Sequence, residues 1–172
     1  MERRAGTALR ASTAVAHRVG DFELTDVLGT GGSASVYAAT DLRDGTRVAL
    51  KILDVEAARH ADHRTAFLRE AALAAAVRHP GAIRIHESGE SAPSDTPPRA
   101  WIAMELLPGT TLGAHVREHG PLTPTDALAL AATLLEVLRA SHRAGGVHRD
   151  VTPANVMLGA DPATRLDPAG VR

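Results

Sequence analysis

The stretch His148-Arg149-Asp150-Val151-Thr152-Pro153-Ala154-Asn155 places an asparagine five residues after an aspartate. Phosphoryl transfer requires a carboxylate that accepts a hydroxyl proton and, close by, an oxygen ligand for a metal ion. A chance loop is the alternative, but these residue types seldom coincide at such spacing. This stretch is therefore the strongest functional signal in the chain.

Lys51 is a second residue that could do chemistry. It is the single lysine among nineteen lysines and arginines, which indicates that this one position needs a lysine rather than any positive charge. In Val48-Ala49-Leu50-Lys51 the alternation of a strand places Ala49 and Lys51 on one face. Glu70, in the next predicted helix, is a candidate to hold the flexible lysine side chain. A solvated helix charge is the alternative for Glu70.

A glycine-rich segment, Gly29-Thr30-Gly31-Gly32, precedes Lys51. Glycines let backbone N–H groups approach phosphate oxygens because no Cβ intervenes. Taken alone, the segment is as typical of a plain turn as of a nucleotide site. A dinucleotide-binding fold requires a helix after the glycines. Here the chain continues as a strand over 35–40, so the glycines are predicted to form a flap over phosphates.

The elements that must position these residues follow from hydrophobic periodicity and turn signals. A strand-rich half with one helix is expected first, then a hinge at 106–109 and a helical half. Asp44-Gly45 is a hairpin turn, His79-Pro80-Gly81 ends the first helix, and Thr123-Pro124 opens the longest one. Leu128, Leu134, Leu135 and Leu138 give that long helix an apolar face. The predicted strands are 22–28, 35–40, 46–53, 82–87 and 100–106, and the predicted helices are 57–77, 111–119 and 123–142.

Composition excludes several classes of protein. A net charge of −1 and an aromatic content of 2% give no indication of a nucleic-acid partner. No apolar run reaches about 18 residues, so no membrane-spanning segment is predicted. The absence of cysteine fits a reducing compartment, and a cytoplasmic location is expected. Arg10, His17 and Arg18 interrupt the apolar stretch that a signal peptide needs, so residues 1–20 are interpreted as a loose leader.

These motifs together resemble the protein kinase family, in its bacterial serine/threonine type, over about Phe22 to Leu158. The glycine-rich loop matches Gly29 to Val36, the Val-Ala-Ile-Lys motif matches Val48 to Lys51, and the catalytic loop matches His148 to Asn155. His79-Pro80 resembles the junction between the family's helix and its fourth strand. The segment 104–109, Met-Glu-Leu-Leu-Pro-Gly, resembles the gatekeeper and the hinge that holds adenine.

The resemblance implies roles for individual residues. Lys51 would contact the ATP phosphates and pair with Glu70, Asp150 would orient or deprotonate the substrate hydroxyl, and Asn155 would bind Mg²⁺. Val36, Ala49 and Leu158 would enclose the adenine ring, and backbone groups of Glu105 and Leu107 would read its edge. The full set of implied ATP-binding residues is Leu28, Gly29, Thr30, Gly31, Gly32, Ser33, Ala34, Val36, Ala49, Lys51, Met104, Glu105, Leu107 and Leu158.

The implied fold is α+β and two-lobed. An N-lobe over 21–107 would contain an antiparallel sheet with one helix, and an incomplete helical C-lobe would occupy 108–172. The implied function is γ-phosphoryl transfer from ATP to serine or threonine hydroxyls of a protein substrate. A non-catalytic ATP-binding pseudokinase and a small-molecule phosphotransferase are the alternatives. Intact Lys51, Asp150 and Asn155 argue against the first, and His-Arg-Asp with Pro153 argues against the second.

Three positions depart from the family pattern. Ala34 replaces the third glycine of the loop, and Thr152 stands where many members carry a lysine that contacts the transferred phosphate. No Asp-Phe-Gly occurs, although Asp167-Pro168-Ala169-Gly170 lies near the expected place. We expect 159–170 to form an enlarged turn and 171–172 to begin the strand leading to that motif. The chain as given is therefore expected to be an N-terminal fragment that transfers phosphate poorly.

Overall fold

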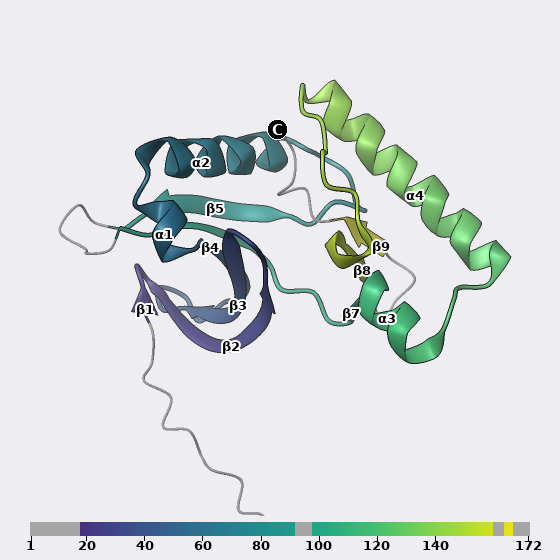
Figure 1. Cartoon of the computed structure of the whole chain (residues 1–172), viewed down its shortest axis with the longest axis horizontal. Helices are drawn as coiled ribbons and strands as arrows, with labels where there is room; N and C mark the ends of the chain where they lie inside the picture. The colour runs from purple at the N-terminus through teal and green to yellow at the C-terminus, as the bar shows by residue number, and fades with distance from the viewer. Residues whose placement is uncertain (1–17, 92–97, 160–163, 167–172) are drawn as a thin grey trace, which may run out of the picture.

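Antiparallel strands dominate the N-terminal half of the chain in the computed structural model, which describes residues 18–91, 98–159 and 164–166 (Figure 1). Helices dominate the half that follows, so the predicted α+β class is confirmed. The strands are β1 (Arg18–Val19), β2 (Phe22–Thr30), β3 (Ala34–Asp41), β4 (Arg47–Leu53), β5 (Ile85–Glu90), β6 (Ala100–Glu105), β7 (Thr110–Thr111), β8 (Val156–Leu158) and β9 (Thr164–Leu166). The helices are α1 (Val55–Ala58), α2 (Ala61–Ala75), α3 (Leu112–His119) and α4 (Pro124–Arg143), with a 3₁₀ turn over Pro153–Asn155.

The first six strands form one antiparallel sheet in the order β1-β2-β3-β4-β6-β5. The β3–β4 hairpin turns where the Asp44-Gly45 signal predicted, and Gly45 adopts φ 78° there. Alternation along β4 sends Val48, Leu50 and Ile52 into one apolar cluster with Phe22. The opposite face carries Ala49 and Lys51, so the sheet has a packed back and a front that is available for a site.

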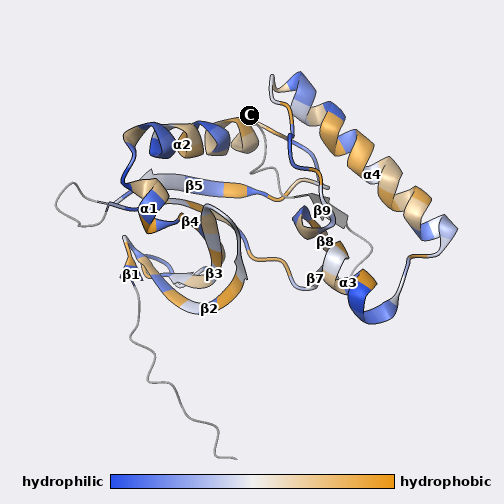
Figure 2. Cartoon of the chain, viewed as in Figure 1, coloured by the Kyte–Doolittle hydropathy of each residue, from blue (hydrophilic) through white to orange (hydrophobic). Residues whose placement is uncertain are grey.

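Helix α2 covers part of this sheet and lies alongside β5 (Figure 1). Phe67 and Ala71 of α2 pack with Ile102 of β6 in a second apolar cluster. Figure 2 shows a mixture of apolar and polar residues along α2, and the buried ones are Phe67, Ala71 and Ala74. This packing sets the position of Glu70, which belongs to the same helix.

The predicted helix over 57–77 is wrong at its start, because the structure divides this segment into α1 and α2. Arg59 and His60 separate them, and His60 takes an extended conformation with ψ 117°. The guanidinium of Arg64 donates to the carbonyl of Ala58 at 2.6 Å, which stabilises the bend. Two other predictions shift: β5 begins at Ile85 rather than at residue 82, and residues 18–19 of the predicted leader pair with β2.

A second sheet, in the order β7-β8-β9, lies beside α3 and the catalytic loop. Val137 and Leu130 of α4 pack with Val156 of β8 and with Val77, which follows α2. Of the predicted apolar face of α4, Leu134 and Leu138 pack against this cluster, whereas Leu128 and Leu135 are 72% and 65% exposed. In the described part of the chain no helix is long and apolar enough to cross a bilayer.

The predicted enlarged turn over 159–170 is wrong in part, because Thr164–Leu166 form β9 and pair with β8. A strand therefore already lies immediately before Asp167, and the strand expected at 171–172 falls outside the described residues. Asp167-Pro168-Ala169-Gly170 itself lies outside the described residues.

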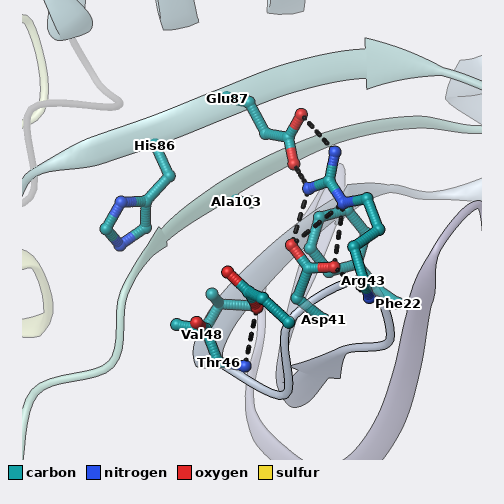
Figure 3. Close-up of a pocket in the computed structure, with 9 residues that line it drawn as sticks. Phe22, Asp41, Arg43, Thr46, Val48, His86, Glu87 and Ala103 are labelled. Carbon is teal, nitrogen blue, oxygen red and sulfur yellow. Dashed lines mark hydrogen bonds and ion pairs between the residues drawn. The ribbon is translucent and has the colours of Figure 1, made fainter.

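An ion-pair cluster closes one end of the sheet, on its packed back (Figure 3). Arg43, in the β3–β4 turn, contacts the carboxylates of Asp41 and Glu87 and lies 5.6 Å from the Phe22 ring centroid. Glu87 belongs to β5, so Arg43 joins the hairpin to a strand at the far edge of the sheet. These residues, with His86 on the opposite side, line a hollow of about 420 Å³.

We expect this ion-pair cluster to make stability fall in acid. The hydrogen bonds from Arg43 lower the pKa of Asp41 from 3.8 to about 2. Because the folded-state value is the lower one, the stabilisation is present well above pH 3.8 and is lost as the pH falls toward 2. Thermal melts of the wild type and Arg43→Ala should differ most at neutral pH and converge in acid. Arg59→Ala, in an exposed pair with Glu56, is the control, and a difference unaffected by pH would contradict the prediction.

Candidate functional site

The glycine-rich flap lies in the turn between β2 and β3. Thr30 pairs with Ser35, and the N–H of Gly31 donates to the carbonyl of Ala34 at 2.9 Å, which closes the turn. A Cβ on Gly31 would lie 3.1 Å from that carbonyl oxygen, so the turn favours glycine there. A Cβ on Gly32 would meet no atom within 4 Å, and this side of the flap stays open to a ligand.

Lys51 lies on the strand next to the flap. It pairs with Val36 of β3 on one side and with Ile102 of β6 on the other. The side chain is half-buried, and it shares the front of the sheet with Ala49. Glu70 is half-buried on α2. The Lys51–Glu70 ion pair stays a prediction.

An apolar cluster lies in front of the sheet and joins it to the helical half. Its buried members are Ala49, Ile83 and Met104, and Val36 and Met157 pack against them. The cluster therefore combines residues of β3, β4, β6 and β8. Ala49 is the smallest side chain here, and its size leaves the strand accessible to a flat ring.

Met157, rather than Leu158, contributes to this cluster from β8. Successive side chains of a strand point to opposite faces, and Leu158 packs in the other cluster, with Val156 and α4. The sequence assigned Leu158 to the adenine site, and that role stays a prediction; in the structure Met157 is the residue of β8 that packs in the cluster of Ala49 and Met104. A three-residue strand carries too short an alternation to reveal its face from sequence.

The segment that connects the sheet to the helices follows Met104. Glu105 makes two hydrogen bonds to Arg84, the residue that precedes β5. Its N–H donates to the Arg84 carbonyl at 2.9 Å, and its carboxylate accepts from the Arg84 N–H at 2.7 Å. Leu106 and Leu107 pack against the apolar cluster. The backbone of this segment is thus held next to Ala49 and Met104.

The catalytic-loop residues come together as the sequence predicts. The side-chain amide nitrogen of Asn155 donates to the carbonyl oxygen of Asp150 at 2.8 Å and to its carboxylate at 2.9 Å. The N–H of Asn155 also donates to the Thr152 carbonyl at 3.0 Å, which closes the 3₁₀ turn. His148 is 7% exposed, and its ring accepts from the N–H of Asp150 at 3.3 Å. Asp150 is therefore oriented from both ends of the loop while it remains exposed.

A glycine that the sequence did not single out supports this loop from the other side. Gly109 has φ 123°, and a Cβ there would lie 2.1 Å from the carbonyl oxygen of Leu158. This close approach lets Thr110 and Thr111 pair with Leu158 and Met157. The Met-Glu-Leu-Leu-Pro-Gly resemblance contained the residue, but only the structure shows why it is glycine.

The donor set fits Mg²⁺ and a nucleotide. Asp150 and Asn155 offer carboxylate and amide oxygens, which are the hard ligands that Mg²⁺ prefers. The amide nitrogen of Asn155 is used within the loop, so its oxygen is the atom that can face a metal ion. The apolar cluster suits a base, and Lys51 and the flap suit phosphates.

Two histidine pairs lie elsewhere. The rings of His60 and His63 are 5.1 Å apart, and those of His115 and His119 are 4.8 Å apart. Within residues 18–91 and 98–159 no group of three or more His, Asp or Glu side chains is placed to hold a metal ion. Neither pair enters the site described above.

A curled antiparallel sheet with a glycine flap and a lysine, followed by a helical segment with an Asp-Asn loop, is the arrangement of the protein kinase fold. The family model described as "Protein kinase domain" matches residues 22–167. The chain therefore belongs to the protein kinase family, and its relatives are of the bacterial serine/threonine type.

Two curated proteins and one solved structure illustrate the likeness. Serine/threonine-protein kinase PknB of Mycobacterium tuberculosis is 38% identical over 161 residues, covering 92% of this chain and 25% of that protein. A probable serine/threonine-protein kinase of Streptomyces coelicolor, SCO3848, is 42% identical over 139 residues, covering 81% of this chain and 20% of that protein. The crystal structure of the M. tuberculosis PknI kinase domain superposes with a TM-score of 0.77 at 28% identity, covering 92% of this chain and 63% of that structure's chain. The chain thus spans about a quarter of the length of PknB.

Proposed function

We propose that the protein is an ATP-dependent serine/threonine kinase that transfers the γ-phosphoryl group to a hydroxyl of a protein substrate. The observation that carries the proposal is the Asp150–Asn155 hydrogen bond of 2.9 Å, because it fixes a proton acceptor next to an oxygen ligand. The boundaries at 21–107 and 108–172 stay predictions, as does the cytoplasmic location. The absence of cysteine supports that location.

Each residue has a definite part in this proposal. Val36, Ala49, Met104 and Met157 bind the base, and the backbone of Glu105 and Leu107 reads its edge. The flap and Lys51 hold the phosphates. Mg²⁺, when bound, neutralises charge on the phosphates, and Asn155 is its ligand within the described residues.

Asp150 orients the substrate hydroxyl and accepts its proton. The hydroxyl oxygen bonds to the γ-phosphorus, the bond from that phosphorus to the bridging oxygen breaks, and ADP leaves. Thr152 offers a hydroxyl donor where many kinases carry a lysine, so less positive charge stabilises the transferred group here.

ATP binding tests the first half of the proposal. Lys51→Met removes the one lysine and keeps the side chain's length and apolar stem, so the affinity for MgATP should fall about tenfold or more. Binding is measured with a fluorescent ATP analogue by competition. Arg47→Met, which removes an exposed cation from the same strand, is the matched control and should bind like the wild type.

Absence of ATP binding by the wild-type protein would contradict the proposal. Binding without phosphate transfer by the full coding sequence would instead support the alternative, a non-catalytic pseudokinase. The observations that favour this alternative are Thr152 and the Pro168-Ala169 pair near the expected Asp-Phe-Gly position.

A further inference from the structure

The segment that follows β4 is bonded to the base of the glycine flap. The hydroxyl of Ser35, at the start of β3, donates to the carboxylate of Asp54 at 3.1 Å. The N–H of Asp54 donates to the carbonyl of Ser33, in the flap, at 2.9 Å. Asp54 therefore holds the flap at two points through its side chain and its backbone. Both Ser35 and Asp54 are half-buried, so water competes less for these bonds than it would on the surface.

The carboxylate of Asp54 does not cap the helix that begins immediately after it. Asp54 is the N-cap residue of α1, with extended φ −61° and ψ 149°. An aspartate at this position normally accepts a hydrogen bond from an N–H of the first helical turn. In this structure the side chain makes no cap hydrogen bond to α1 and accepts from Ser35 instead. Four-residue α1 thus lacks a stabilising cap, while the flap gains an anchor.

The same short helix connects the flap to α2. The carbonyl of Asp54 accepts from the N–H of Ala58 at 2.8 Å, and the carbonyl of Ala58 accepts from the guanidinium of Arg64 at 2.6 Å. Arg64 lies in α2, and its Nε is 3.4 Å from the Glu90 carboxylate of β5. A continuous set of contacts therefore runs from the flap through Asp54 to the helix that carries Glu70.

We propose that Asp54 is a positioning residue that holds the glycine flap over the ATP phosphates and ties it to α2. The inference rests on the proposed function, since it assumes that ATP binds under the flap. Asp54 does not touch the nucleotide: it acts through Ser33 and Ser35. Loss of this anchor should weaken the contacts to phosphates and leave those to the base intact.

The test compares the affinities for ATP and for adenosine, which lacks the phosphates. Ser35→Ala and Asp54→Ala should each weaken ATP binding by about fivefold to tenfold, the effect of one hydrogen bond to a charged group. Adenosine binding should change by less than about twofold, and Ser35→Thr, which keeps the hydroxyl, should restore ATP affinity. Because both substitutions remove one bond, the double variant should bind no more weakly than either single variant.

Glu56→Ala is the matched control, because Glu56 is an exposed acid of α1 that pairs with Arg59 rather than with the flap. Thermal melts of each variant check that the fold is retained. Equal losses for ATP and adenosine, or additive losses in the double variant, would overturn the inference. If the wild-type protein bound neither adenosine nor ATP, the proposed function itself would fail. The two failures are therefore distinguishable.

Discussion

Replacing Asp150 by asparagine should lower the rate of phosphate transfer by about 10²–10⁴-fold, the usual contribution of a general base. The substitution keeps the size of the side chain and an oxygen that can accept from the Asn155 amide, so the 2.9 Å contact that shapes the loop can persist. Only the ability to take the proton is lost. The affinity for MgATP should therefore stay within about threefold of wild type.

This effect is measured by steady-state kinetics of the protein expressed from the full coding sequence, with a serine- or threonine-containing substrate. Asp62→Asn is the matched control, since Asp62 is an exposed carboxylate in the first turn of α2. A variant that transferred phosphate at the wild-type rate would show that Asp150 is not the proton acceptor. A loss confined to ATP affinity would place it in nucleotide binding instead.

Replacing Gly109 by alanine destabilises the protein by roughly 2–6 kcal/mol, the sum of a forbidden backbone conformation and an overpacked contact. At φ 123° any L-residue is strained, and the new Cβ would lie 2.1 Å from the carbonyl oxygen of Leu158. The backbone fixes the position of the Cβ, and the oxygen it meets is itself a backbone atom, so no side-chain rotation can relieve the clash. The turn must move, and the β7–β8 pairing that places Met157 against the apolar cluster of Ala49, Ile83 and Met104 moves with it.

Gly120 provides the control for this prediction. It also has a positive φ, 87°, but a Cβ there would meet nothing within 4 Å. Gly120→Ala should therefore cost only the backbone strain, roughly 1–3 kcal/mol. Denaturant unfolding measures the free energy of unfolding of both variants. Equal losses would show that the contact with Leu158 does not contribute to the destabilisation.

The sequence predicted the sheet well because its signals are local. Alternating apolar residues and the Asp44-Gly45 turn define β3 and β4 without any knowledge of the rest of the chain. The catalytic loop was also predictable, since its hydrogen bonds join residues at most five positions apart. For the same reason, Asp150 and Asn155 could be assigned as a pair before the fold was known.

The features that the sequence missed depend on contacts between distant segments. The break between α1 and α2 could not be predicted, because Arg59 and His60 are compatible with a helix and Arg64 stabilises the bend from the next element. The packing of Met157, rather than Leu158, beside Ala49 could not be predicted either, because β8 has only three residues and the direction of its side chains depends on its pairing with Thr110 and Thr111. The hydrogen bond between Ser35 and Asp54 joins residues nineteen positions apart, and no local sequence pattern predicts it.

The proposed serine/threonine kinase activity is tested by transfer of labelled γ-phosphate from ATP to a mixture of serine-, threonine- and tyrosine-containing peptides. We expect label on serine or threonine with the protein expressed from the full coding sequence, dependence on Mg²⁺, and loss of the label in both Lys51→Met and Asp150→Asn. Label that persisted in Asp150→Asn, or that appeared on a small-molecule acceptor and on no peptide, would contradict it.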